Sequence, residues 1–227
     1  MYINYEEKGH GDPILLVHGW GGDHNSFKKL ADLIPDAYRV IRIDLPGFGK
    51  SDLPKHQWGV EEFGRCLVDF LKTLNIGKVI YFGHSFGGSL GIYLAAHYPK
   101  LISKLILCAP SYKREAKKSK GLLTRLPQPL RIILYRVFFP HSDLWRFPRL
   151  EPNFRKIVKQ DLTIYLSKVK ARTLILWGET DRKTPIEQSI LLHKEIPNSI
   201  LKTFPDIGHN LPLQHPELVY QELKKFL

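Results

Sequence analysis

The chain has 227 residues, of which 43% are hydrophobic, and it carries a formal net charge of +12. This composition predicts one globular domain with a sizeable core, and its apolar runs fall well short of the roughly 20 residues that a membrane span requires. Two cysteines, Cys66 and Cys108, are too few for a disulfide framework. No signal-peptide pattern opens the chain, so we expect a cytoplasmic protein.

Apolar runs alternate with helical patterns along the chain. The expected strands cover Tyr2–Tyr5, Ile14–Val17, Arg39–Ile43, Lys78–Phe82, Lys104–Cys108, Thr173–Trp177 and Ser199–Phe204. The expected helices cover Ser26–Ile34, Val60–Leu74, Ser89–His97, Ile186–Glu195 and Pro216–Leu227. Since most of these strands are apolar throughout, we predict an α/β fold: a mostly parallel, twisted sheet of about seven strands with helices on both faces.

Residues 111–172 interrupt this alternation. They contain five prolines and 16 Lys and Arg against 4 Asp and Glu, whereas the rest of the chain has 18 residues of each sign. We predict a basic helical cap here, inserted in a core formed by residues 1–110 and 173–227. Within it, Leu130–Phe139 is apolar with two arginines. We favour a lid helix over an apolar substrate pocket, and a helix at a membrane interface is the alternative.

The most informative motif is Gly83-His84-Ser85-Phe86-Gly87-Gly88. It follows an expected strand and precedes an expected helix, which is the setting of a nucleophile elbow. A serine on such a tight turn is held above the sheet at a helix N-terminus, where developing negative charge is favoured. Ser85 is therefore the candidate nucleophile, and an incidental serine in a glycine-rich turn is the alternative.

A serine hydroxyl needs a base, and the base needs an orienting acid. His209 and Asp181 each follow an expected strand, and the chain order Ser, Asp, His is the one that α/β-hydrolases use. We predict His209 as the general base and Asp181 as its partner. Glu179 and Asp206 are rivals for the acid.

Two N–H groups are needed to bind the oxyanion of a tetrahedral intermediate. The backbone amide of Phe86 follows the nucleophile. The second candidate is the backbone amide of Trp20, in the glycine-rich loop His18-Gly19-Trp20-Gly21-Gly22. We expect His18 to shape this loop rather than to act as a base.

Cofactor and metal motifs are missing from the sequence. Residues 44–51, Asp-Leu-Pro-Gly-Phe-Gly-Lys-Ser, lack the spacing of a phosphate-binding loop and are expected to form a structural turn. No cluster has zinc spacing, and no dinucleotide-binding glycine motif follows the first strand. We expect no cofactor and no metal, and the basic segment lacks a nucleic-acid recognition motif.

Together, the loop at 18–22, the turn at 44–51, the elbow, and the loops carrying Asp181 and His209 resemble the α/β-hydrolase superfamily over nearly the whole chain. His-Gly-Trp-Gly at 18–21 is similar to small carboxylesterases that cleave pimeloyl-carrier methyl ester. The resemblance implies a serine hydrolase acting on a small-molecule ester, with the insertion as its cap. Thioesterase, C–C hydrolase, perhydrolase and acyltransferase chemistries use the same triad, and a weakly catalytic ligand-binding receptor is a further alternative. The basic cap would attract an anionic substrate, an acidic carrier protein or an anionic membrane surface, and a solvated, solubilising surface without a specific partner is the alternative.

Overall fold

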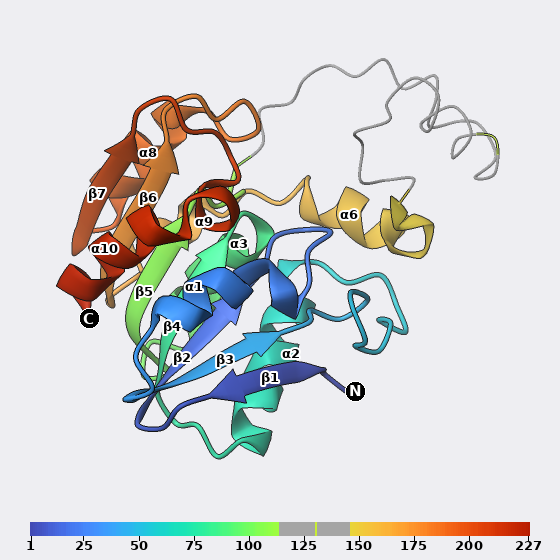
Figure 1. Cartoon of the computed structure of the whole chain (residues 1–227). Coiled ribbons are helices and arrows are strands. Elements are labelled where there is room, and N and C mark those ends of the chain that lie inside the picture. Colours follow the sequence, from blue (N-terminus) through green and yellow to red (C-terminus); the bar gives the residue numbers. More distant parts are fainter. Residues whose placement is uncertain (114–129, 131–145) are drawn as a thin grey trace.

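The computed structural model describes residues 1–113, 130 and 146–227 (Figure 1). Its described residues form a seven-stranded sheet in the order β1-β3-β2-β4-β5-β6-β7. Strand β1 runs antiparallel to β3, and every other neighbouring pair is parallel. The predicted fold class is confirmed. The strands are β1 (Tyr5–Lys8), β2 (Asp12–Val17), β3 (Tyr38–Ile43), β4 (Val79–His84), β5 (Ile102–Cys108), β6 (Arg172–Gly178) and β7 (Ser199–Phe204).

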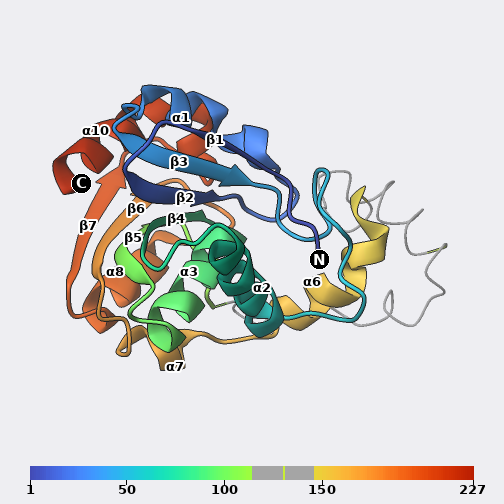
Figure 2. The same cartoon turned by 90° about the horizontal axis from the view of Figure 1, so that it is seen from below.

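Helices cover both faces of the sheet, as Figure 2 shows. One face carries α1 (Lys28–Leu33), α9 (Leu211–Gln214) and α10 (Pro216–Phe226), and the other carries α2 (Val60–Thr73), α3 (Phe86–His97) and α8 (Ile186–Glu195). A short 3-10 helix, η1 (His24–Phe27), leads into α1. Alternate residues of each central strand enter the two cores: Leu15 packs in one and Leu16 in the other, both fully buried.

Two expected elements show the largest differences in their starting residue, three residues each. The first strand was expected at Tyr2–Tyr5 but lies at Tyr5–Lys8. This strand has a partly charged sequence, so no apolar run indicates its position. The residues before it are bound to the segment that follows β3: the Tyr2 N–H donates to Asp52 and the Asn4 N–H donates to Ser51. The helix expected from Ser89 begins at Phe86, directly after the elbow serine.

The described part of the inserted segment is helical and is attached to the core. It contains η3 (Pro148–Leu150), α6 (Glu151–Ile157) and α7 (Thr163–Leu166). The Gln160 side chain accepts a hydrogen bond from the Val60 N–H at 2.8 Å, and Lys156 pairs with Glu62 at 2.7 Å. Apart from Leu130, the expected lid helix Leu130–Phe139 lies outside the described residues.

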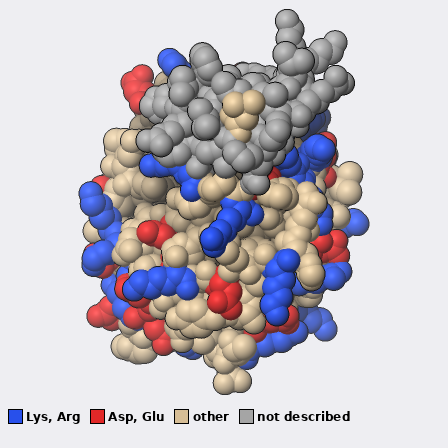
Figure 3. Space-filling model, turned by 90° about the vertical axis from the view of Figure 1, so that its right-hand side faces the viewer, with Lys and Arg blue, Asp and Glu red and all other residues tan. Residues whose placement is uncertain are grey.

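The structure also shows how charge is distributed over the surface and how long and apolar the helices are. On the face seen in Figure 3, acidic and basic side chains are interspersed over the described surface. Across the described part of the chain, no helix is long and apolar enough to cross a membrane.

Candidate active site

The elbow residues adopt a strained turn between β4 and α3. Ser85 has φ 52° and ψ −114°, a conformation that non-glycine residues rarely adopt outside functional sites. The neighbouring glycines leave no room for a side chain: a Cβ would lie 2.3 Å from the Gly87 carbonyl oxygen at Gly83, and 2.1 Å from the Val17 carbonyl oxygen at Gly87. Close backbone packing therefore accounts for glycine at both positions.

The structure brings Ser85, His209 and Asp181 into one hydrogen-bonded chain. The Nε2 atom of His209 lies 3.0 Å from Ser85 Oγ, and its Nδ1 atom lies 2.6 Å from Asp181 Oδ2. Asp181 lies in the loop after β6, and His209 lies in the loop after β7. These loops meet the elbow because the carboxyl ends of parallel strands share one edge of the sheet.

Asp181 is held in a fixed orientation by its own loop. Its Oδ1 atom accepts N–H bonds from Lys183 at 2.8 Å and Thr184 at 2.9 Å, and the Thr184 hydroxyl donates to Oδ2 at 2.6 Å. Burial acts to raise the pKa of Asp181, but the hydrogen bonds from His209 and Thr184 hold that pKa below its usual value. An ionised Asp181 requires the proton on Nδ1 of neutral His209, which leaves Nε2 to accept a proton from Ser85.

The rival carboxylates lie in other surroundings. Glu179 accepts a hydrogen bond from the Thr203 hydroxyl at 2.7 Å, and Asp206 is an exposed turn residue with φ 57°. Neither is hydrogen-bonded to the His209 ring. The geometry thus favours Asp181 over both rivals.

The predicted oxyanion donors flank the elbow from two elements. Phe86 opens α3, and Trp20 lies in the loop after β2, where a Cβ on Gly19 would come within 3.1 Å of Ser85 Cβ. In the described ranges, neither main-chain N–H donates a hydrogen bond. The Trp20 ring packs edge-on against Phe48, Phe86 and Phe154, with centroids 5.0, 5.7 and 5.1 Å away.

Two buried histidines, His18 and His84, form hydrogen bonds with the main chain of the loops around the candidate triad. His18 Nδ1 donates to the Gly19 carbonyl at 2.7 Å, and His18 Nε2 accepts the Leu45 N–H at 2.9 Å. This agrees with the expectation that His18 shapes its loop, and burial lowers the pKa of His18 to about 4. His84 Nε2 donates to the His209 carbonyl at 2.8 Å, and burial lowers the pKa of His84 to about 3.

The turn at 44–51 is a structural element, as expected. Asp44 has no exposed surface and accepts hydrogen bonds from the main chain of His24 and Lys50 and from the Asn4 side chain. Burial acts to raise the pKa of Asp44, but these bonds hold it below its usual value. A Cβ on Gly49, where φ is +52°, would lie 2.1 Å from Asp44 Oδ2.

Three residues near the candidate triad were missed by sequence reasoning: Thr184, His84 and Ser111. The Ser111 hydroxyl lies 3.1 Å from Ser85 Oγ. The spacing of Thr184, three residues after Asp181, is typical of a turn that closes on an aspartate and could have identified it. No local pattern marks Ser111, which is 26 positions from the nucleophile.

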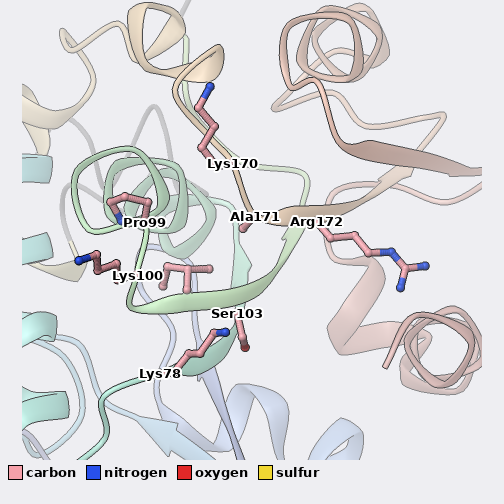
Figure 4. Close-up of a pocket in the computed structure, with 8 residues that line it drawn as sticks. Lys78, Pro99, Lys100, Ser103, Lys170, Ala171 and Arg172 are labelled. Carbon is pink, nitrogen blue, oxygen red and sulfur yellow. The ribbon is translucent and has the colours of Figure 1, made fainter.

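One cavity lies away from these residues, at the opposite edge of the sheet (Figure 4). Its volume is about 490 Å³ and its lining includes Lys78, Lys100 and Lys170, near the amino ends of β4, β5 and β6. Around the triad, nothing resembles a metal centre: within the described ranges, no three His, Cys, Asp or Glu side chains are placed to hold an ion.

Known proteins that are similar to this chain include hydrolases and esterases. Among curated relatives, the uncharacterized hydrolase YugF of Bacillus subtilis (strain 168) is 25% identical over 255 residues, covering 100% of this chain and 93% of its own. The 2-hydroxy-6-oxononadienedioate/2-hydroxy-6-oxononatrienedioate hydrolase of Escherichia coli (strain SE11) is 29% identical over 263 residues, covering 100% and 91%.

Among solved structures, the thermophilic esterase of Thermogutta terrifontis (malate bound) has a TM-score of 0.79 and 26% identity, covering 99% of this chain and 92% of that one. An esterase from Exiguobacterium antarcticum has a TM-score of 0.79 and 25% identity, covering 99% and 94%. A family model described as the alpha/beta hydrolase fold matches residues 12–129, more than half of the chain. The chain belongs to the α/β hydrolase family.

Proposed function

We propose that this chain is a serine hydrolase that cleaves carboxylic esters through an acyl-enzyme. The single observation that carries the proposal is the unbroken chain from Asp181 through His209 to Ser85, with contacts of 2.6 and 3.0 Å. The esterases among the structural relatives support the ester assignment. No further group is needed for this chemistry, since the triad provides the nucleophile, the base and the orienting acid.

In the acylation step, Ser85 Oγ forms a bond to the ester carbonyl carbon while its proton passes to His209 Nε2. The carbonyl π electrons move to oxygen, and that oxyanion accepts hydrogen bonds from the backbone amides of Trp20 and Phe86. Such donors stabilise charge that develops only in the transition state. Collapse of the intermediate breaks the bond to the leaving alcohol, which takes the proton from His209.

Water then completes the cycle. It gives a proton to His209 Nε2 and attacks the acyl carbon, and the bond to Ser85 Oγ breaks as that oxygen regains the proton. Asp181 remains ionised throughout and stabilises the imidazolium formed in both steps. Its low pKa is consistent with that role, because an ionised carboxylate is needed opposite Nδ1.

The aromatic cluster beside the elbow is proposed as the wall of the acyl pocket. Trp20, Phe48 and Phe86 come from the core, and Phe147 and Phe154 come from the inserted segment, with Phe147 5.0 Å from Phe48. Ligand pockets are lined mainly by apolar and aromatic side chains. In this proposal residues 111–172 act as the cap, with residues 1–110 and 173–227 as the catalytic core.

A second candidate is C–C bond hydrolysis with the same residues. The observation that favours it is the 29% identity, over the whole chain, to relatives named 2-hydroxy-6-oxononadienedioate hydrolases. That substrate is a dianion, which fits the +12 charge of this chain. An anionic substrate would be steered by positive charge and its on-rate would fall with salt. An acidic carrier protein would be steered in the same way.

The test compares substrates and variants in one assay. A series of p-nitrophenyl esters from acetate to decanoate gives the acyl-length preference, and an anionic ester measured from 20 to 500 mM NaCl gives the charge dependence. We expect Ser85→Ala to lose at least about 10³-fold in kcat, because removal of the nucleophile in a triad enzyme can cost about 10⁶-fold. Full activity in Ser85→Ala would refute the mechanism, and faster turnover of the dienedioate than of any ester would favour the second candidate. Ligand-dependent association with a partner protein, without turnover, would favour a receptor.

A further inference from the structure

Ser111 occupies a position that the proposed mechanism does not use. Its hydroxyl oxygen lies 3.1 Å from Ser85 Oγ, and His209 Nε2 lies 3.0 Å from the same atom. The nucleophile therefore has two hydrogen-bond partners. Only one of them, His209, is accounted for by the triad.

The main chain holds Ser111 against the elbow. Its N–H donates to the Ser85 carbonyl at 3.1 Å, and its own carbonyl accepts the Ser89 hydroxyl at 2.9 Å. The preceding turn is equally constrained: Ala109 has φ 44°, and a Cβ on Gly88 would lie 2.7 Å from Pro110 Cβ. The hydroxyl is thus presented to Ser85 by a fixed backbone rather than by a loose surface loop.

The residue that follows Ser111 anchors the other end of this contact. Tyr112 is fully buried, its hydroxyl donates to the Gln188 carbonyl at 2.8 Å, and its carbonyl accepts the Leu162 N–H at 2.9 Å. Gln188 belongs to α8, and Leu162 precedes α7 in the inserted segment. Ser111 therefore lies between two anchored points, the elbow and a buried tyrosine.

The direction of the Ser111 hydrogen bond follows from the triad. The ionised Asp181 accepts a hydrogen bond from the Nδ1 proton of His209, so Nε2 carries no proton and must accept the Ser85 proton in the reactive arrangement. Ser85 then has no proton left for Ser111, and the Ser111 hydroxyl must donate to Ser85 Oγ. With both neighbours in place, the Ser85 hydroxyl points its proton at His209 and is held in a single rotamer.

On the basis of the proposed function, we propose that Ser111 is a positioning residue for the nucleophile: its hydroxyl donates to Ser85 Oγ and fixes the Ser85 proton on the line to His209. The donated bond also stabilises the negative charge that develops on Oγ as its proton leaves. A neutral hydrogen bond of this kind corresponds to a rate effect of about 3- to 10-fold. Substrate binding is not part of this role, so the effect falls on kcat rather than on KM.

The test uses two variants of equal shape, Ser111→Thr and Ser111→Val, which differ in the hydroxyl alone. We expect the threonine variant to retain most of the wild-type kcat, and the valine variant to be about 3- to 10-fold slower than threonine with the same KM. The second readout is the rate at which a fluorophosphonate labels Ser85, which should fall by the same factor. Ser89→Ala serves as a control for loss of the backbone anchor without loss of the Ser111 hydroxyl.

Each outcome decides the matter. Equal kcat and equal labelling rates for the two variants would overturn the role of Ser111, as would a slower valine variant whose whole deficit lies in KM. If the thermal unfolding midpoints of the two variants differ, the kcat of each variant is divided by the fraction of Ser85 that is labelled at saturation. The comparison then concerns folded, active enzyme alone. If the wild-type chain itself is not labelled at Ser85, the proposed function fails rather than this inference.

Discussion

Acid should destabilise the fold between pH 6.5 and pH 4, because His18 and His84 are buried as neutral rings. Both residues have folded-state pKa values, about 4 and about 3, below the value of 6.5 expected in the unfolded chain. Below pH 6.5 the unfolded chain takes up protons that the folded chain refuses, so stability falls with pH. Asp44 and Asp181 also have lowered pKa values, but their contribution is lost only as pH falls through the lower range of a carboxylate.

The size of the effect follows from the pKa difference. Each pH unit between the unfolded-state and folded-state pKa values lowers the free energy of unfolding by about 1.36 kcal/mol per histidine. At pH 5, about 1.5 units below the unfolded-state value of 6.5, the loss is therefore about 2 kcal/mol for His18 and about 2 kcal/mol for His84. For a domain of this size, about 4 kcal/mol lowers the unfolding midpoint by about 8–16 °C. Asp44 and Asp23 lie near His18 and act against this shift, but burial is the largest influence on its pKa.

The assay is urea unfolding at pH 7.5, 6.5, 5.5 and 5.0 for wild type, His18→Gln and His10→Gln. His18→Gln starts less stable at pH 7.5 because its two main-chain hydrogen bonds are altered. Between pH 7.5 and pH 5, the free energy of unfolding of His18→Gln should fall by about 2 kcal/mol less than that of the wild type. His10 is exposed, so His10→Gln should keep the wild-type pH dependence. Wild-type stability that is constant from pH 7.5 to 5, or an unchanged slope in His18→Gln, would refute the assignment of this window to buried neutral histidines.

Two substitutions test the elbow and the acid loop. Gly87→Ala should lower the thermal unfolding midpoint, measured by calorimetry, by about 2–12 °C, because overpacking costs about 1–3 kcal/mol. Gly77→Ala is the control and should leave the midpoint unchanged, since no atom lies within 4 Å of the new Cβ. Equal midpoints for the two variants would contradict the close packing at Gly87. Thr184→Val removes the hydroxyl that donates to Asp181 Oδ2 and should raise the pKa of Asp181. It should also lower kcat about 10- to 150-fold, since hydrogen bonds to charged groups contribute about 1.5–3 kcal/mol. The exposed Thr180→Val is its control, and equal kcat values for the two variants would contradict the orienting role of Thr184.

The core of the fold was predictable because its strands are apolar throughout. The strands at β2, β4, β5 and β6 are buried on both faces, so hydrophobic runs alone identify them. Strand β1 was misplaced because it is a partly charged edge strand paired on one side only. Helix α9 was missed because four residues with a proline carry no helical period.

Site residues that follow strands could be predicted, since parallel strands deliver their following loops to one edge of the sheet. This rule covers Ser85, Asp181 and His209, which follow β4, β6 and β7 and are hydrogen-bonded to one another in the structure. Contacts that depend on a particular turn could not be predicted. The approach of Ser111 to Ser85 depends on the positive φ of Ala109, which no residue type in that stretch indicates.

Covalent labelling shows directly whether Ser85 is the nucleophile. The wild-type chain is incubated with a fluorophosphonate, digested and analysed by mass spectrometry, beside the Ser85→Ala variant and a Ser111→Ala variant. We expect one phosphonyl adduct per chain, on Ser85, with loss of esterase activity in proportion to labelling and no adduct in Ser85→Ala. An adduct on another residue, or full esterase activity in chains fully labelled at Ser85, would contradict this assignment.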